Sequence, residues 1–295
     1  MWIEELRLAE KLPAGYEATV AEYVAPLAER ICTLREHLGR PIVVGINGAP
    51  GSGKSTFALF LAEWLQRESG LSAVSLSLDD LYLGKHAREE LAEKSHPLLR
   101  TRGVPGTHDV ALGQELLQEL TEQSEGCVVR LPVFNKATDD RLQQSEWRSI
   151  AAPVDVVLFE GWCVGARPQR DVDLRDPVNA LEAQDDTNGR WRSFVNNNLR
   201  IDYAELFSRL DALVMLRIPS FDKVFEWREL QEHKLLGGSG MNAAEIRHFM
   251  MYFERLTRHM LARMPDYANT IIDLDDAHDT SGMVNKNWPG EPDSS

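Results

Sequence analysis

The chain has 295 residues, of which 43% are hydrophobic, and a formal net charge of −14 at pH 7. This length and hydrophobic content suffice for one large domain with a buried core. The acidic balance argues against a nucleic-acid or anionic-membrane surface, although screening over roughly 8 Å still allows a local basic pocket for an anionic substrate. We therefore expect no nucleic acid and no membrane among its partners.

Cysteine usage and the N-terminus indicate the compartment. Cys32, Cys127 and Cys163 lie far apart and in no metal-ligand pattern, which suits reduced thiols. Glu4 and Glu5 stand where a signal peptide needs basic residues, and no apolar run approaches the length of a membrane span. The sequence predicts a soluble, cytoplasmic protein, with monomer and homodimer both left open.

The two ends of the chain differ in pattern from its middle. Apolar residues recur at helical spacing over 16–38, which predicts a helix packed on the core with a kink or break at Pro26. Residues 1–40 are therefore expected to form an N-terminal helical segment, and 41–277 the main domain. The stretch 278–295 is rich in Asp, Gly, Pro, Asn and Ser, which predicts a disordered tail.

The most specific motif is G-x-x-x-x-G-K-S at 48–55, between the apolar run 41–46 and a helical stretch that ends near Arg67. Such a glycine-rich turn points backbone N–H groups at one anion, while its lysine contacts the β and γ phosphates and its hydroxyl binds Mg²⁺. A helix N-terminus there adds a favourable dipole. The predicted phosphate-binding residues are Gly48, Ala49, Pro50, Gly51, Ser52, Gly53, Lys54, Ser55 and Thr56.

Carboxylates follow two of the predicted buried strands. Strand 73–78 ends at Asp79 and Asp80, and strand 154–159 ends at Glu160. Ligands of parallel α/β sheets bind outside the carboxyl ends of the strands, so these acids are expected near the phosphates. Asp79 is predicted to accept a substrate hydroxyl proton or to help hold the metal, with helix capping as the alternative. Glu160 occupies the position of the Walker B carboxylate.

Two polar loops, 96–109 and 132–141, are expected to face the site. Arginine suits bidentate pairing with a carboxylate, so basic residues of these loops are candidates for binding an anionic acceptor. They are Arg100, Arg102, Lys136 and Arg141. A third polar stretch, 165–199, is expected to form solvated loops and short helices over the sheet's edge.

The last third of the main domain predicts a strand over 210–218, a helix over 221–235, a long amphipathic helix over 243–264 and a short strand over 269–274. Gly237-Gly238-Ser239-Gly240 is either a hinge or an ordinary helix terminator.

Four motifs together resemble the phosphoribulokinase and uridine kinase superfamily of P-loop kinases: G-x-x-G-x-G-K-S, L-S-L-D-D-L-Y, P-x-F-N-x-x-x-x-D-R and V-V-L-F-E-G-W. Within it, H-P-L-L-R-T-R-G-V-P-G-T-H-D and F-E-W-R-x-L-Q-E resemble the plant-type D-glycerate 3-kinases and their bacterial and fungal relatives. Those relatives carry Tyr-Asp where this chain has Phe134-Asn135.

The resemblance implies a three-layer α/β P-loop NTPase fold, a parallel sheet with helices on both faces and a lid at about 219–242. It also implies ATP and Mg²⁺ as cofactors. The expected catalytic residues are Lys54, Asp79 and the lid arginine Arg228. The expected metal ligands are Ser55, Asp79 and Glu160. The expected acceptor-binding residues are Asp80, Tyr82, Arg100, Arg102, His108, Asp109, Phe134, Lys136 and Arg141.

The predicted function is transfer of the γ-phosphoryl group of ATP to a hydroxyl of a small hydroxy acid, most like D-glycerate. Within kinases, a nucleoside or a pantothenate-like acceptor is the alternative. A nucleotide-binding protein without transfer activity is a third reading, and it would not need Asp79. A regulatory GTPase is disfavoured because Asn135-Lys136-Ala137-Thr138 has Thr where a guanine-reading motif needs Asp.

Overall fold

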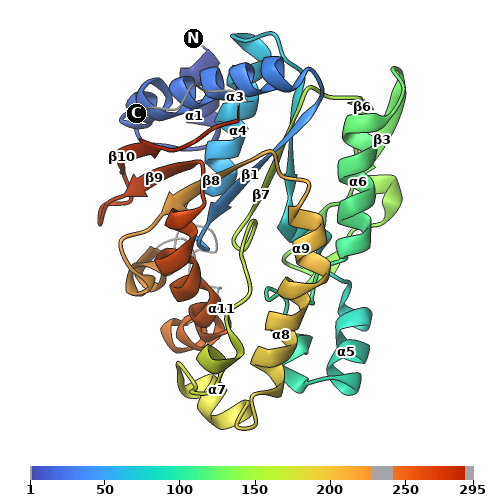
Figure 1. The fold of residues 1–295 in the computed structure, drawn as a ribbon, viewed down its shortest axis with the longest axis vertical. Coiled ribbons are helices and arrows are strands. Elements are labelled where there is room, and N and C mark those ends of the chain that lie inside the picture. Colours follow the sequence, from blue (N-terminus) through green and yellow to red (C-terminus); the bar gives the residue numbers. More distant parts are fainter. Residues whose placement is uncertain (1, 228–241, 290–295) are drawn as a thin grey trace.

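The computed structural model describes residues 2–227 and 242–289 (Figure 1). At its centre lies a six-stranded sheet with the order β10-β9-β8-β1-β7-β2. Its strands are β1 (Ile42–Gly48), β2 (Ala73–Ser77), β7 (Val156–Gly161), β8 (Ala212–Arg217), β9 (Thr270–Leu274) and β10 (Thr280–Asn285). All neighbouring pairs are parallel except β10 and β9, which are antiparallel.

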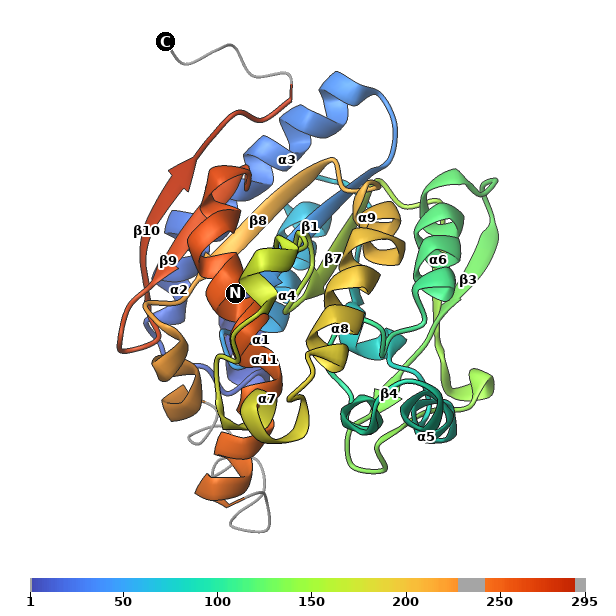
Figure 2. The same cartoon turned by 60° about the horizontal axis from the view of Figure 1, so that its bottom comes forward.

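The middle of the sheet is covered on both faces. Every residue of β1 and β7 is buried, as expected for parallel strands that read as continuous apolar runs. Helices α3 (Ala25–Leu38) and α4 (Lys54–Arg67) lie on one face, while α6 (Val110–Glu122), α9 (Asp202–Phe207) and α11 (Ala243–Arg263) lie on the other (Figures 1 and 2). The predicted three-layer α/β architecture is confirmed.

The N-terminal segment consists of α1 (Trp2–Ala9) and of α2 (Tyr16–Thr19), which continues through one π-helical turn (Val20–Val24) into α3. The apolar stripe of this segment is buried against the core. Pro26 lies in the first turn of α3 and lacks the N–H that a continuous helix would use there. The irregularity expected at Pro26 therefore takes the form of the π turn just before it.

Outside the main sheet, β3 (Cys127–Leu131) pairs with β6 (Arg148–Ala152) in a separate antiparallel ribbon. In the polar loop between them, two strands of two residues each, β4 (Phe134–Asn135) and β5 (Asp140–Arg141), pair as a hairpin. The sequence pattern had not revealed β6, because its alternation of exposed and half-buried residues is weak. Helix α5 (Lys85–Lys94) and a 3₁₀ turn (Pro97–Arg100) precede α6.

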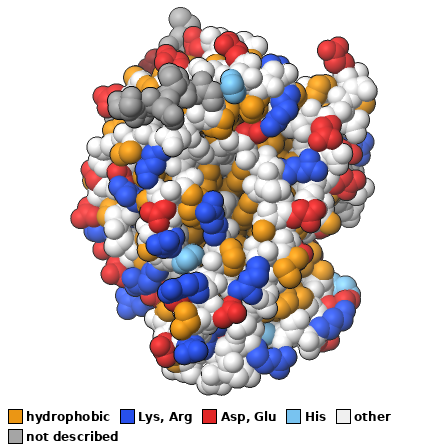
Figure 3. All heavy atoms as spheres, viewed as in Figure 1, with side chains coloured by type: hydrophobic (Ala, Val, Ile, Leu, Met, Phe, Trp, Pro, Cys, Tyr) orange, Lys and Arg blue, Asp and Glu red, His pale blue; other side chains and the backbone are white. Residues whose placement is uncertain are grey.

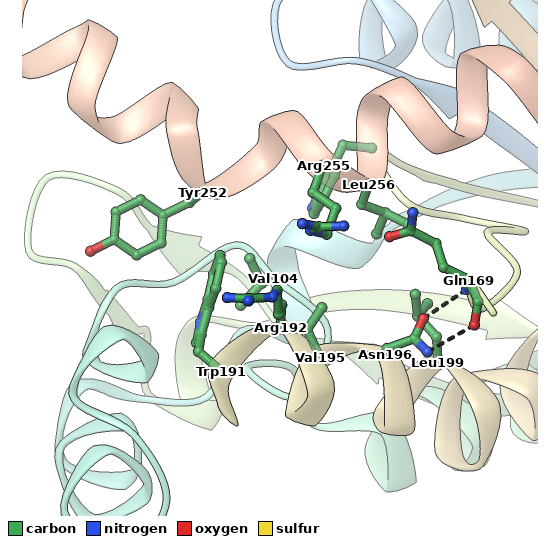
Figure 4. A pocket seen from close by; sticks show the side chains of 11 residues that line it. Val104, Gln169, Trp191, Arg192, Val195, Asn196, Leu199, Tyr252, Arg255 and Leu256 are labelled. Carbon is green, nitrogen blue, oxygen red and sulfur yellow. Dashed lines mark hydrogen bonds between the residues drawn. The ribbon is translucent and has the colours of Figure 1, made fainter. Parts of the chain in front are cut away.

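The stretch 165–199 has the predicted short helices, but it is not solvated throughout. It contains α7 (Ala180–Asp185) and most of α8 (Arg190–Arg200), and it buries two ion pairs. Arg192 Nη1 lies 2.8 Å from Asp186 Oδ2, and Arg255 Nη2 of α11 lies 2.7 Å from Glu182 Oε2. Both arginines line a cavity of about 20 Å³ between α8 and α11, about the size of one water molecule (Figure 4). These charged side chains can be buried because each is paired with a side chain of opposite charge.

The predicted disordered tail is also wrong over 278–289. Residues 280–285 form β10 on the edge of the sheet, and Trp288 beyond it is only 3% exposed. Its Nε1 donates to Thr270 Oγ1 at 3.0 Å. The polar composition concealed this strand because an edge strand needs only one apolar face.

Residues 221–227 are helical, as predicted. The remainder of the proposed lid, including Arg228 and the glycine run at 237–240, lies outside the described residues. Basic and acidic side chains are interspersed over the surface in Figure 3. In the described ranges, none of the helices combines the length and apolar character that a membrane crossing requires.

Replacing Trp288 with Ala should lower the free energy of unfolding by about 3 kcal/mol, because a buried indole and its hydrogen bond are lost. The matched control is Val284→Ala on β10, whose side chain is 47% exposed and whose truncation should change stability little. Urea unfolding of both variants measures the difference. Equal stabilities for the two would contradict the docking of this segment.

Candidate active site

The phosphate-binding loop joins β1 to α4. Gly51 and Gly53 both adopt φ of +82°, a conformation that favours glycine. A Cβ on Gly48 would lie 2.5 Å from Ser52 Oγ, so a larger residue there would force the Ser52 side chain to move. The loop ends at Lys54 and Ser55, the first residues of α4, whose N–H groups have no helical acceptor. The result is a cradle that can hold an anionic phosphate.

Two polar atoms around this cradle are buried without a hydrogen-bond partner in the described part of the chain, Ser52 Oγ and Glu160 Oε2. The other oxygen of Glu160 accepts a hydrogen bond from Ser55 Oγ at 2.8 Å. Glu160 itself is 2% exposed. A buried carboxylate with one free oxygen beside a serine hydroxyl is a donor set that fits a divalent cation.

The acids at the strand ends also repel one another. Burial raises the pKa of Asp80, and the negative charges of Asp79 and Glu160 raise it further, against a hydrogen bond from the Phe134 N–H. A cation bound here would relieve this repulsion. Among residues 2–227 and 242–289, no three His, Cys, Asp or Glu side chains meet closely enough to hold an ion alone. Phosphate and water would have to supply its remaining ligands, as is usual for Mg²⁺ in kinases.

Asp79 lies in a 3₁₀ turn (Leu78–Leu81) directly after β2. Its Oδ2 lies 2.8 Å from Lys136 Nζ, and its Oδ1 accepts a hydrogen bond from Tyr82 Oη at 2.9 Å. Burial disfavours the charged form, but the charges of Lys136 and Lys54 and the two hydrogen bonds outweigh it. Together they hold the pKa of Asp79 well below its usual range, so this carboxyl is ionised at neutral pH.

Aromatic side chains pack around Tyr82, the residue whose hydroxyl donates a hydrogen bond to Asp79. The ring of Tyr82 stacks on His108 with centroids 4.5 Å apart, and Phe134 packs edge-on against Tyr82 at 5.3 Å. His108 Nδ1 lies 2.5 Å from the hydroxyl of Tyr203, a fully buried residue of α9. Burial lowers the pKa of His108 to about 3, so the imidazole is neutral at pH 7.

The basic residues chosen from sequence have different surroundings. Arg102 pairs with Asp139, and its guanidinium lies 5.5 Å from the centroid of the Phe134 ring. Arg141 pairs with Asp109 at 3.3 Å and also donates to the carbonyls of Leu81 and Tyr82. These contacts tie the β4–β5 hairpin to the turn that carries Asp79.

The remaining candidates are less central. Asp109 caps α6 by accepting the Leu112 N–H, in addition to its pair with Arg141. Asp80 accepts the Phe134 N–H at 3.0 Å and so holds the start of β4. Arg100 is exposed at the end of a 3₁₀ turn. Over the described residues, no hydrogen bond, ion pair or ring contact joins its side chain to the Asp79 cluster.

Sequence reasoning missed several residues that hold the site together. Arg88 of α5 is 1% exposed and donates to the carbonyls of Leu83, Arg100 and Asp139. Trp162 Nε1 donates to Gly103 O at 2.8 Å, which ties the loop after β7 to the 96–109 loop. The sequence does not indicate that Arg88 is buried, because its charged neighbours in K-H-A-R-E-E are typical of a solvated helix face.

Comparison with known proteins identifies the family of the chain. No family model matches the chain. It is 34% identical over 230 residues to the uncharacterized kinase mug58 of Schizosaccharomyces pombe, covering 73% of this chain and 79% of that protein. The chain belongs to the P-loop kinase family that includes D-glycerate 3-kinase. The resemblance predicted from the motifs is thereby confirmed, and the protein is an ATP-dependent phosphotransferase with an alcohol acceptor.

Two further similar proteins are D-glycerate 3-kinases. The kinase is 31% identical over 219 residues to the chloroplastic D-glycerate 3-kinase of Arabidopsis thaliana, covering 71% of this chain but only 45% of the longer plant protein. A solved structure of D-glycerate 3-kinase from Cryptococcus neoformans aligns with 89% of this chain and 99% of its own, with a TM-score of 0.75 and 26% identity. P-loop kinases of this kind use ATP together with a divalent metal.

The neutral, buried His108 predicts a stability that falls on acidification. Between about pH 6.5 and 3 the unfolded chain binds a proton at this residue that the folded kinase does not, so stability decreases as the pH falls through this window. From pH 6 to pH 5, protonation of His108 in the unfolded chain should lower the free energy of unfolding by about 1 kcal/mol. Urea unfolding should show a correspondingly smaller loss for His108→Gln over the same step. Equal losses would contradict a neutral His108.

Proposed function

We propose that the kinase transfers the γ-phosphoryl group of ATP, bound with Mg²⁺, to a hydroxyl of D-glycerate. The observation that carries the proposal is the contact of Asp79 with Lys136 at the carboxyl end of β2. It puts an ionised carboxylate suited to receive a hydroxyl proton next to a cation suited to hold an acceptor carboxylate. A small hydroxy acid presents both groups.

On the donor side, the backbone of 48–55 surrounds the phosphates and Lys54 contacts the β and γ groups. Ser55 and Glu160 would hold the metal, whereas both oxygens of Asp79, the third predicted ligand, accept hydrogen bonds from Lys136 and Tyr82. Bound Mg²⁺ would neutralise charge that develops on the transferred group. Lys54 and the helix N-terminus of α4 stabilise the same negative charge from the protein side.

On the acceptor side, Asp79 orients the reacting hydroxyl and takes its proton. The acceptor oxygen forms a bond to the γ-phosphorus, the bond from that phosphorus to the β–γ bridging oxygen breaks, and ADP leaves with the electron pair. Tyr82 keeps Asp79 in place through its hydrogen bond, and His108 and Phe134 pack against the ring of Tyr82. Arg102, Arg141 and Lys136 supply positive charge, and Arg228 is proposed to close over the phosphates.

Pantothenate is the second candidate acceptor. The pantothenate kinase of Bacillus velezensis is 32% identical over 137 residues, which cover 46% of this chain and 40% of that enzyme. This match covers less of the chain than the D-glycerate 3-kinase matches do. Pantothenate also carries a carboxylate, but it is a longer molecule than D-glycerate.

A coupled ADP-release assay over a panel of D-glycerate, L-glycerate, pantothenate, uridine and cytidine tests the proposal. We expect D-glycerate to give the highest kcat/KM, and removal of Mg²⁺ by chelation to abolish turnover. Stimulation by pantothenate or a nucleoside but not by D-glycerate would refute the proposed acceptor. ATP turnover stimulated by none of them would argue against a small-molecule kinase of this type.

Replacing Asp79 with Asn removes the proton acceptor while keeping the shape of the side chain. We expect kcat to fall about 10²- to 10⁴-fold, while ATP affinity measured by fluorescence titration changes little. Asp171→Asn is the control, because Asp171 is an exposed carboxylate that pairs with Arg200 at 2.6 Å on the surface. A nucleotide-binding module without transfer activity would be indifferent to both changes.

A further inference from the structure

One contact in the site joins the predicted base to the predicted acceptor-binding cation. Lys136 Nζ lies 2.8 Å from Asp79 Oδ2, and Tyr82 Oη donates to Oδ1, so each carboxylate oxygen already accepts a hydrogen bond. A hydroxyl group that approaches Asp79 must therefore compete with a charged partner. A hydroxyl also hydrogen-bonds to the ionised carboxylate, but it lacks the Coulombic attraction of the Lys136 ammonium group, so a hydroxyl alone does not displace Lys136.

Two other basic residues of the acceptor side, Arg102 and Arg141, are held by groups that take no part in the reaction. Arg102 pairs with Asp139, and Arg141 is fixed by Asp109 and two carbonyls. Lys136 differs from them because its partner is Asp79 itself. Its side chain is also 60% exposed, whereas that of Asp79 is 22% exposed.

The backbone around Lys136 is fixed, so only its side chain has to move. Asp80 accepts the Phe134 N–H at 3.0 Å, and Asn135 Oδ1 accepts the Ala137 N–H at 2.9 Å. These two bonds hold the residues on either side of Lys136 in place. Its flexible four-carbon stem then allows the ammonium group to swing away from Asp79 while the loop stays where it is.

We propose that Lys136 is a coupling residue: it occupies Asp79 until the carboxylate of an acceptor draws it away, so phosphoryl transfer requires an acceptor that carries an anionic group. In the free enzyme, Lys136 prevents a water molecule from donating its proton to Asp79, so ATP is not hydrolysed. When the acceptor binds, its carboxylate takes over Lys136, and its hydroxyl takes the vacated oxygen of Asp79. The bonds that form and break in transfer are those given above.

This inference rests on the proposed function for the anionic acceptor, but its first test does not depend on which acceptor is correct. ATP hydrolysis is measured without any acceptor for the wild type, Lys136→Met, Lys136→Arg and Lys94→Met. We expect Lys136→Met to hydrolyse ATP about tenfold faster or more, since water gains access to Asp79. Lys136→Arg, which restores a cation, should hydrolyse ATP more slowly than Lys136→Met.

Lys94→Met is the matched control, because Lys94 also pairs with a carboxylate, Glu90 at 3.1 Å, but on the surface of α5. Its hydrolysis rate should equal that of the wild type. The affinity for ATP, measured for all variants, should be unchanged, and thermal unfolding verifies that each variant is folded at the assay temperature. A Lys136→Met enzyme whose acceptor-free hydrolysis stays at the wild-type rate would overturn the inference, even if D-glycerate proves to be the acceptor.

The second test separates the carboxylate from the reacting hydroxyl. D-Lactate has the carboxylate and 2-hydroxyl of D-glycerate but lacks the 3-hydroxyl. If D-glycerate is phosphorylated, D-lactate should stimulate ATP hydrolysis several-fold in the wild type and not in Lys136→Met, while glycerol should stimulate neither. Lys136→Met should also show a higher KM for D-glycerate and a larger share of ATP lost to hydrolysis. Failure of D-lactate to stimulate the wild type would count against the inference.

Discussion

The site depends on the parallel register of three strands. Ile46 of β1 lies opposite Glu160 of β7, which in turn lies opposite Ser77 of β2. Because all three run in the same direction, the P-loop, Glu160 and Asp79 emerge at one edge of the sheet. A slip of one residue would turn Glu160 to the other face and break its hydrogen bond to Ser55. The buried apolar residues of β1 and β7 fix this register.

Local sequence patterns predict much of this arrangement. The P-loop, the acids after β2 and β7 and the apolar runs before them follow simple rules of strand ends and phosphate binding, so the sequence predicted them. The ion pairs were not predictable in the same way. Asp139 finds Arg102 and Arg88 only because the β4–β5 hairpin folds back over the 96–109 loop. Tyr203 meets His108 across 95 residues, and no spacing rule connects them.

The errors share a physical cause. Composition reports how polar a stretch is, but a polar side chain can be buried when a partner is buried with it. Glu182, Asp186 and Arg192 were therefore read as surface residues, and the strand after His278 as a tail. The structure shows what Phe134 and Asn135 do at the position where the resemblance predicted Tyr-Asp. Phe134 packs against Tyr82, and Asn135 caps the turn that follows it.

The buried pair of Arg255 and Glu182 limits how this protein can change over evolutionary time. Loss of either partner would strand the other charge inside the protein, at a cost of about 3 to 5 kcal/mol, whereas an apolar replacement of both is tolerated in other proteins. Positions 182 and 255 should therefore vary together or not at all. Such paired variation, 73 positions apart, would reveal the packing of α7 on α11 to anyone comparing relatives of this chain.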